Sequence, residues 1–547
     1  MIRKKKTYFI GEELIRKNLV TLEQIGQALE VQEQTGEFLG RILVRFGFIP
    51  ESKLIEVLAD QFELRLVRPD EMEISKEVLQ RVPPKVAHHY HIFPVEIKGN
   101  HLLIAMNEPP EFDVIQELNA ILGIEIQVLL AERSRIDEAI QKHYGIGASI
   151  VDQLTKTKKK QSKAQVEAQM GSTEEMEATA GESSVRELVN QLLMDAQKKR
   201  ASDIHIEPFS DRLSVRYRID GILQEAKVPD EIRQFHSSII SRIKIMANLD
   251  ISERRLPQDG RIKISIQNEE LDLRVSLLPT AYGESLVIRI LSPARLLRLD
   301  GIGLAQDYLA RFRQILQKPY GVILLTGPTG SGKTTTLYGA LSSLNDVGRK
   351  IITVEDPVEY QLDGIIQMQV HPKIDLTFSI GLRHMLRHDP DVLMVGEIRD
   401  AETAEIAIRS SLTGHLVFST LHTNDAVGAI ARLLDLGMQP YLVSSSLECV
   451  IAQRLVRLIC EKCKTKKDGE YIGQGCEQCN DTGFYGRTAI HEFLVLDDEL
   501  RDMVARGMSA LEIREASVKK GMRLLKDDGL SKVRAGLTTT AEVLRVT

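Results

Sequence analysis

The stretch best suited to chemistry is a glycine-rich loop that follows the apolar run 322–325. The loop consists of Gly327, Pro328, Thr329, Gly330, Ser331, Gly332, Lys333, Thr334 and Thr335. Its first eight residues match the phosphate-loop pattern G-x-x-x-x-G-K-[ST], between an expected buried strand and an expected helix that begins near Lys333. Backbone N–H groups would surround a β-phosphate, Lys333 would reach the β- and γ-oxygens, and Thr334 would offer its hydroxyl to Mg²⁺. The pattern predicts a nucleoside triphosphate site, and its alternative is a plain strand-to-helix turn.

Carboxylates follow two further expected strands of the same domain. Glu355, Asp356 and Glu359 come after the apolar run 351–354, and Glu397 comes after the run 392–395. The carboxyl ends of parallel strands face the nucleotide, so an acid there can orient or deprotonate an attacking water. Glu397 stands where an acid holds the Mg²⁺ shell, and its extra methylene relative to Asp favours contact through a water. The alternative for the first three acids is a set of solvated loop residues.

Four of the five cysteines form two C-x-x-C pairs, Cys460 with Cys463 and Cys476 with Cys479, separated by twelve residues. In a reducing compartment such pairs indicate a metal site rather than disulfides. Four thiolate ligands leave no position for water or substrate, so the pattern predicts a structural Zn²⁺ site. The alternative is four cysteines without a metal. The fifth cysteine, Cys449, is expected in the core.

Length and composition favour a cytoplasmic protein of several domains. The 547 residues exceed one hydrophobic core, and a prior of about 150 residues per domain suggests three or four domains. With a formal net charge of −6 and no tryptophan, the chain lacks the basic excess and the stacking residues typical of nucleic-acid-binding proteins. No apolar run approaches about 20 residues, and acidic residues follow the basic start where a signal peptide would be apolar. We therefore expect a cytoplasmic location and no nucleic-acid partner.

The chain is expected to be an α/β protein of five segments. These are a helical repeat module (1–62), an α/β module (63–145), a flexible linker (146–183), a second α/β domain (184–300) and the phosphate-loop domain (301–547), with the cysteine element at 460–479. In the repeat, residues 10–32 align with 39–61 at an offset of 29 residues, with two short helices expected in each copy. The linker is predicted from a basic run followed by an acidic one without aromatic residues. Ser184, with Glu187 three residues on, is predicted to cap the next helix.

The order of the motifs closely resembles that of the secretion ATPase superfamily of type II secretion and type IV pilus assembly. The matching stretches are GPTGSGKTTTLY, ITVEDPVEY, LRHMLRHDPDVLMVGEIRD and TGHLVFSTLHTN, together with ASDIHIEP and VRYRIDG upstream. The resemblance runs from about residue 184 to the C-terminus. It implies a RecA-like ATPase core preceded by a PAS-like second α/β domain, assembled as a homohexameric ring, with ATP as substrate and Mg²⁺ as cofactor.

The resemblance also implies roles for single residues. Glu359 falls at the catalytic glutamate, Glu397 at the Walker B glutamate, and His415 and His422 in the His box. Arg274 and Arg289 match arginines that approach the γ-phosphate, where a guanidinium stabilises transferring charge, and Arg218 and Arg454 are further candidates for ATP binding. Spacing alone leaves open whether the arginines are solvent-facing strand residues. It also leaves open whether the histidines, at the two ends of the run 416–421, are structural.

The function that the resemblance implies is a cytoplasmic motor that hydrolyses ATP and extends a type IV pilus. Its expected partners are an inner-membrane platform protein and cytoplasmic ring proteins, so it would lie peripherally at the inner membrane. The tetracysteine element favours extension, because pilus retraction ATPases generally lack it. The closest alternative is the type II secretion ATPase, which has the same motifs. A nucleic-acid translocase is disfavoured by the charge, and a protein with a dead nucleotide site by the intact Lys333, Thr334, Glu359 and Glu397.

The N-terminal repeat resembles the cyclic di-GMP-binding N-terminal domain of some pilus ATPases. The family has an arginine in each copy that is expected to pair with a guanine or a phosphate. Here Phe9 and Phe38 take its place, in FIG and FLG respectively. The module is therefore either a cyclic di-GMP site or a packing and docking module that meets a membrane partner.

Overall fold

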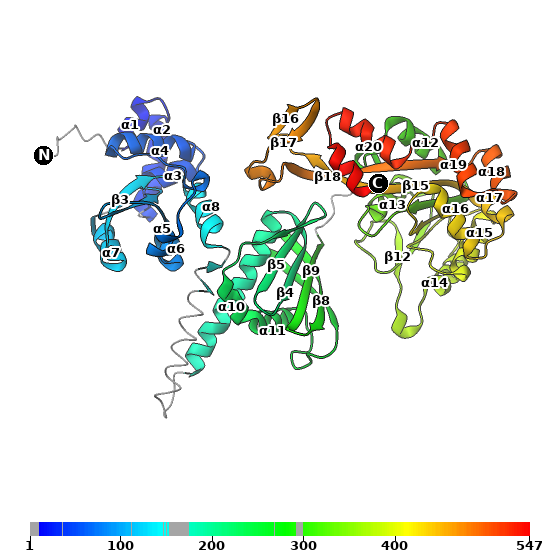
Figure 1. Ribbon diagram of the computed structural model, residues 1–547, viewed down its shortest axis with the longest axis horizontal. Helices are drawn as coiled ribbons and strands as arrows, with labels where there is room; N and C mark the ends of the chain where they lie inside the picture. The colour runs from blue at the N-terminus through cyan, green and yellow to red at the C-terminus, as the bar shows by residue number, and fades with distance from the viewer. Residues whose placement is uncertain are drawn as a thin grey trace. The chain divides into compact units, whose positions relative to one another are not determined.

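The computed structural model describes residues 10–35, 37–110, 112–145, 147–148, 150–151, 174–266, 269–291 and 299–547. Phe9 and most of the predicted linker lie outside these ranges. The chain divides into two units: the first contains the N-terminal modules and most of the second α/β domain, and the second contains the phosphate-loop domain. The architecture is that of a multidomain α/β protein, as the sequence predicts (Figure 1).

The N-terminal repeat forms four helices, two for each copy. They are α1 (Ile10–Arg16), α2 (Leu22–Thr35), α3 (Leu39–Arg45) and α4 (Glu51–Phe62). The offset of 29 residues carries α1 onto α3, and the aligned Leu14 and Leu43 are both fully buried. Equivalent apolar positions thus build one shared core, and the predicted pair of helices in each copy is confirmed.

The following module is a small sheet with the order β1-β2-β3. Its strands are β1 (Ile92–Lys98), β2 (His101–Met106) and β3 (Glu125–Leu130). The helices are α5 (Lys76–Arg81), α6 (Pro84–Tyr90), α7 (Phe112–Leu122) and α8 (Arg133–Tyr144). A tight turn joins the antiparallel β1 and β2, whereas α7 provides the crossover between the parallel β2 and β3. The predicted α/β character of this module is confirmed.

The second α/β domain is built on a six-stranded sheet with the order β6-β5-β4-β9-β8-β7. The strands are β4 (Ala201–Pro208), β5 (Leu213–Ile219), β6 (Ile222–Glu225), β7 (Gln258–Ile266), β8 (Glu269–Thr280) and β9 (Gly283–Leu291), and the helices are α10 (Glu174–Lys198) and α11 (His236–Met246). Helix α10 begins at Glu174, so the prediction that Ser184 caps it is wrong. Residues 174–183 include four glutamates and two alanines, which have high helix propensity, so the sequence favours a helix that begins before Ser184.

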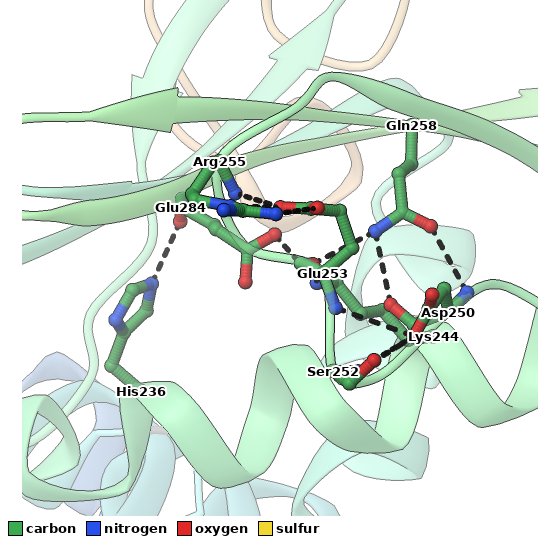
Figure 2. A network of polar contacts seen from close by, with 8 residues as sticks. All are labelled: His236, Lys244, Asp250, Ser252, Glu253, Arg255, Gln258 and Glu284. Carbon is green, nitrogen blue, oxygen red and sulfur yellow. Dashed lines mark hydrogen bonds and ion pairs between the residues drawn. The ribbon is translucent and has the colours of Figure 1, made fainter.

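A buried ion pair holds the loop between α11 and β7 (Figure 2). The side chains of Lys244 and Glu284 are 1% and 8% exposed, and the charged atoms lie 2.7 Å apart. Lys244 also donates to the carbonyl of Glu253 at 2.6 Å, and the side-chain amide of Gln258 donates to that carbonyl and to the carbonyl of Asp250. Buried charges are tolerated only when paired and hydrogen-bonded, so these contacts favour one conformation of the loop 250–258.

The phosphate-loop domain contains a seven-stranded sheet with the order β12-β11-β13-β14-β10-β15-β18. The strands are β10 (Gly321–Thr326), β11 (Ile351–Glu355), β12 (Ile366–Gln369), β13 (Val392–Val395), β14 (Leu416–Leu421), β15 (Leu447–Ile459) and β18 (Phe484–Val495). The described pairs are parallel apart from β15 with β18. The predicted mostly parallel sheet is therefore confirmed.

Helices cover both faces of this sheet (Figure 1). On β10, Val322 and Leu324 belong to one buried core and Ile323 and Leu325 to the other, because successive strand residues point to opposite faces. The first core includes α14 (Phe378–Met385), α15 (Ala401–Leu412), α16 (Ala426–Asp435) and α17 (Pro440–Ser446), and the second includes α12 (Gln306–Leu316) and α13 (Lys333–Leu344). Burial on both faces explains why the strands read as continuous apolar runs.

The C-terminal part adds a hairpin and four helices. These are β16 (Lys464–Lys467), β17 (Glu470–Gly473), α18 (Asp498–Ala505), α19 (Ala510–Lys519), α20 (Leu525–Arg534) and α21 (Thr540–Val546). The hairpin lies within the twelve residues between the two C-x-x-C pairs. Across the described ranges, no helix combines the length and apolar character needed to span a bilayer.

Candidate nucleotide site

The phosphate loop joins β10 to α13, as its sequence pattern requires. Gly332 precedes the helix with φ at 85°, a left-handed conformation in which glycine is unstrained. A Cβ atom at Gly327 would lie 2.6 Å from the carbonyl oxygen of Gln453 on β15, so a side chain there would force the loop away from the strand. The structure therefore explains two of the glycines of the pattern by backbone conformation and by close approach.

Lys333 closes over the loop. Its Nζ donates to the carbonyl of Gly327 at 2.7 Å and to that of Pro328 at 3.2 Å. Burial lowers the pKa of Lys333 to about 8, although the nearby carboxylate of Glu397 acts in the opposite direction. An ammonium group that is partly desolvated and held by two neutral carbonyls is suited to exchange them for phosphate oxygens.

Glu397 lies at the carboxyl edge of the sheet, just beyond β13. Its side chain is 14% exposed and pairs with the guanidinium of Arg399 and with Nε2 of His422, which is 3.3 Å away. His422 directly follows β14, the strand between β13 and β10. Glu397, His422 and the phosphate loop thus gather at one edge of the sheet, where nucleotides bind in folds of this kind.

His415 lies at the opposite edge. It directly precedes β14, so the length of the strand separates it from His422 by roughly 20 Å. Its Nδ1 is 2.9 Å from the carbonyl oxygen of Ser410 and 3.3 Å from the hydroxyl of Thr413, both at the end of α15. The structure therefore brings only one of the two predicted histidines to Glu397.

The three predicted acids at the carboxyl end of β11 differ in their surroundings. Glu355 is 3% exposed and accepts hydrogen bonds from Tyr338 and Thr353. Glu359 is half-buried, and its backbone N–H donates to the hydroxyl of Tyr338 at 3.3 Å. Asp356 is exposed and lies 3.8 Å from Arg399. The side chain of Glu355 is thus buried from solvent, and Glu359 is the more solvent-exposed of the two glutamates.

Arg454 is the one predicted arginine that lies in the phosphate-loop domain. It is 9% exposed, and its guanidinium donates to the carbonyls of Gln453 and Asn424 at 3.0 Å and 2.8 Å. One guanidinium nitrogen would lie 3.0 Å from a Cβ atom at Gly327, so Arg454 borders the phosphate loop. Burial lowers the pKa of Arg454, and a positive charge at this position favours an anionic ligand.

The other three predicted arginines lie on strands of the second α/β domain. Arg218 is on β5, Arg274 on β8 and Arg289 on β9. Asp203 on β4 pairs with two of them, at 2.9 Å from Arg289 and 3.6 Å from Arg218. Strand order explains this cluster, because β4 lies between β5 and β9.

The groups at the phosphate loop fit ATP and Mg²⁺. Thr334 in the first turn of α13 and Glu397 beyond β13 are oxygen donors of the kind that Mg²⁺ prefers. The hydroxyl of Ser331, in the loop itself, is buried and has no hydrogen-bond partner among the residues that the structure describes. An orphaned hydroxyl beside a lysine and backbone N–H groups is consistent with a loop shaped around a phosphate.

The four predicted zinc ligands converge. Their sulfur atoms all lie within 4.8 Å of one another. The sulfur of Cys476 lies 3.7 Å from those of Cys460 and Cys479, and the sulfur of Cys463 lies 3.8 Å from that of Cys479. A tetrahedron with Zn–S bonds of about 2.3 Å has edges of about 3.8 Å, so the thiols match a tetrahedral Zn²⁺ site. Backbone N–H groups of Cys476 and Gly483 lie 3.2 and 3.3 Å from the sulfur of Cys479, where they would stabilise a thiolate.

Three neighbours of the site, Tyr338, Gln367 and Arg399, were not predicted from the sequence. Arg399 lies two residues after Glu397, and its pairing with that glutamate is a local signal that the motif offers. Tyr338 and Gln367 carry no such signal. Their contacts with Glu355 join a helix and a strand that only the folded sheet brings together.

The fold and the site define a phosphate-loop ATPase with a RecA-like core. The chain belongs to the family described as type II/IV secretion system protein, whose model matches residues 178–545. A second family model, the MshEN domain, matches residues 62–150.

Two characterised relatives match along nearly the whole chain. The type IV pilus assembly ATPase PilB of Myxococcus xanthus is 42% identical, and the match covers 98% of each chain. The type II secretion system protein E of Xanthomonas campestris pv. campestris is also 42% identical, with 98% of each chain covered. Among solved structures, the ATPase DotB of Legionella pneumophila is 23% identical, with a TM-score of 0.51 over 65% of this chain and 94% of that one. At that identity the likeness shows the fold alone.

Proposed function

We propose that this protein is a cytoplasmic motor ATPase that powers extension of a type IV pilus. The observation that carries the proposal is the nucleotide site of a chain that matches a pilus assembly ATPase along 98% of its length. Lys333, Glu397 and Arg454 border one phosphate loop there. The site has the groups that phosphoryl transfer requires, namely anion-binding backbone, a lysine and a carboxylate for the metal.

Each residue of the site then has a defined task. The loop backbone and Lys333 bind the β- and γ-phosphates. Glu359 orients the attacking water and accepts its proton, while Thr334 and Glu397 hold the Mg²⁺ shell. When bound, Mg²⁺ neutralises negative charge on the phosphate oxygens. Two further predicted residues, Arg274 and Arg289, supply positive charge for the γ-phosphate from the second α/β domain.

The working assembly that we propose is a homohexameric ring at the inner membrane. In such a ring the second α/β domain transmits nucleotide-driven motion to the inner-membrane platform protein, and cytoplasmic ring proteins complete the machine. ATPase activity per chain should then rise with protein concentration as rings form. The test is steady-state ATP hydrolysis across a dilution series with sizing in parallel. Activity that stays constant from monomer to ring would contradict the coupled motor.

The type II secretion ATPase is the second candidate, because the relative from that system is equally similar and equally covered. The four-cysteine element favours pilus extension over retraction but does not separate extension from secretion. Deletion of the gene separates them: loss of surface pili with normal secretion supports pilus extension, and loss of secreted proteins with normal pili supports secretion. Complementation with the intact gene is the control.

A cyclic di-GMP site at the N-terminal module is a separate proposal. An apolar groove of about 970 Å³ is lined by this module and by the adjoining α/β module, with Phe38, Arg41 and Arg45 from the first and Arg133 from the second. The Arg41 guanidinium lies 5.7 Å from the centre of the Phe38 ring and pairs with Glu108. Aromatic and guanidinium groups are suited to a guanine base and a phosphate. Calorimetric titration with cyclic di-GMP tests the proposal, with Arg41→Ala as the variant that should weaken binding.

A further inference from the structure

A buried tyrosine connects the phosphate-loop helix to the segment that carries Glu359. Tyr338 lies on α13, five residues after Lys333, and is fully buried. Its hydroxyl contacts the carboxylate of Glu355 at the end of β11 and receives the backbone N–H of Glu359 at 3.3 Å. One hydroxyl thus joins the helix that begins at the nucleotide to the backbone of the proposed catalytic glutamate.

Hydrogen-bond polarity sets the direction of this connection. The Tyr338 hydroxyl donates its hydrogen bond to the carboxylate of Glu355. Its oxygen is then left to accept from the N–H of Glu359 and, at 3.4 Å, from the side-chain amide of Gln367. Burial and the adjacent Glu355 carboxylate raise the pKa of Tyr338 well above its ordinary value, so the hydroxyl keeps the proton that this arrangement needs.

Gln367 on β12 forms further hydrogen bonds with the backbone of the segment that follows Glu359. Its amide nitrogen lies 3.1 Å from the carbonyl oxygen of Tyr360, and its amide oxygen accepts from the N–H of Leu362 at 2.7 Å. The amide nitrogen also lies 3.1 Å from the Glu355 carboxylate. The segment 359–362 is therefore held at three backbone positions by two side chains that share one buried acid.

Packing alone does not account for this polar cluster. The Tyr338 ring packs edge-on against Tyr360 with centroids 4.6 Å apart, a contact that a phenylalanine would also make. A buried carboxylate and hydroxyl are costly to desolvate, and an apolar pair of the same shape would often stabilise the fold equally well. The cluster therefore points to a need for defined geometry at Glu359.

We propose that Tyr338 is a positioning residue that fixes Glu359 relative to the phosphate-loop helix and so sets the turnover rate without binding ATP. The inference rests on the proposed catalytic role of Glu359. It also means that a shift of α13 on nucleotide binding is passed directly to Glu359. Since misplacement of a catalytic group by about 1 Å costs up to about 100-fold, the hydroxyl should affect kcat strongly.

The test is Tyr338→Phe, which keeps the ring and removes only the hydroxyl. We expect kcat to fall about 10-fold to 100-fold, while KM and the affinity for a fluorescent ATP analogue stay near wild type. The matched control is Tyr308→Phe: Tyr308 lies in the same buried core, and its hydroxyl accepts the N–H of Arg523 at 2.7 Å, away from Glu359. Equal loss of activity in both variants, or normal turnover in Tyr338→Phe, would overturn the inference.

A double-mutant cycle separates positioning from general structure. If Tyr338 acts through Glu359, then Tyr338→Phe should lower kcat in the wild-type background and have little further effect in Glu359→Gln. If the two substitutions instead lower kcat by factors that multiply in the double variant, the role of Tyr338 is merely structural. Should Tyr338→Phe fail to fold, Gln367→Met loosens the same segment from β12 and should show the same dependence on Glu359. Normal turnover in Glu359→Gln would instead refute the role of Glu359, and absence of ATP hydrolysis in the wild type would refute the proposed function.

Discussion

Arg289 and Asp203 are directly paired across two neighbouring strands of the second α/β domain. They face each other in the antiparallel register of β9 and β4, and the Nε of Arg289 lies 2.9 Å from a carboxylate oxygen of Asp203. The Asp203 side chain is only 9% exposed, whereas that of Arg289 is 55% exposed. The guanidinium is thus anchored at one edge and presents its other N–H groups to solvent, an arrangement suited to a phosphate.

Arg289→Ala should lower kcat by about 10³-fold while changing ATP affinity less, because an arginine at the γ-phosphate acts on charge that develops in the transition state. Steady-state ATPase kinetics with a separate ATP-binding measurement check this. Arg212→Ala is the control, since Arg212 is a similarly exposed arginine of the same domain whose contacts, with Asp211 and the Phe209 ring, are local in sequence. A normal kcat in Arg289→Ala would show that the phosphate-loop domain works without the second domain.

Glu397→Gln should still bind ATP but lose nearly all turnover. The loop backbone and Lys333 remain, whereas the charge that we propose to organise the Mg²⁺ shell, and that pairs with His422, is lost. Binding of a fluorescent ATP analogue and phosphate release measure the two properties separately. Glu405→Gln, which changes an exposed glutamate on α15 that pairs with Arg409, is the control. Substantial turnover in Glu397→Gln would exclude the proposed role.

The parts of the candidate site whose geometry could be predicted from the sequence are local. The phosphate loop needs only a strand, nine consecutive residues and a helix, and the convergence of the four cysteines needs two tight turns whose cysteines are close in sequence. Both are fixed by backbone geometry within short segments. The seven-stranded sheet was likewise predictable in class, because strands buried on both faces read as continuous apolar runs.

The remaining parts depend on juxtapositions that no short segment encodes. His415 and His422 look equivalent at the two ends of one apolar run, yet the direction of β14 brings only His422 to Glu397. The pairing of Asp203 with Arg289 depends on strand order and register in another domain. The start of α10 was misjudged because Ser184 has the chemistry of a cap, whereas the preceding residues also favour helix.

Purified protein should contain about one Zn²⁺ per chain, and Cys476→Ser should lose it and destabilise the region around the hairpin β16–β17. A thiolate site couples metal affinity to folding, so removal of one ligand weakens both. Elemental analysis measures the metal, and limited proteolysis measures the local loosening. Cys449→Ala is the matched control, because Cys449 is a buried cysteine on β15 outside the cluster. Wild-type protein without metal would remove the zinc assignment.

ATP affinity should fall as the pH rises above about 8. Burial lowers the pKa of Lys333 to about 8 in the ATP-free protein, so the amine loses its charge there at a pH where most lysines are still protonated. Bound phosphates favour the charged amine and raise its pKa. At a pH between the pKa of Lys333 without ATP and its pKa with ATP, the protein should therefore take up a proton when ATP binds. The terminal phosphate itself is ionised throughout this range, since its pKa is about 6.

The lowered pKa of Lys333 also predicts how the free energy of unfolding changes with pH. Between pH 8 and 10.5 the unfolded chain holds the Lys333 proton and the ATP-free folded chain does not, so the contribution of this lysine to the free energy of unfolding should rise with pH. Calorimetric titration with ATP at pH 9 in two buffers of different ionisation enthalpy measures the proton uptake directly. Lys350→Met, which changes an exposed lysine before β11, should leave the uptake unchanged. A dissociation constant for ATP that does not change from about pH 7 to about pH 10 would contradict this prediction. It would mean that Lys333 is already charged before ATP binds and that burial does not lower its pKa.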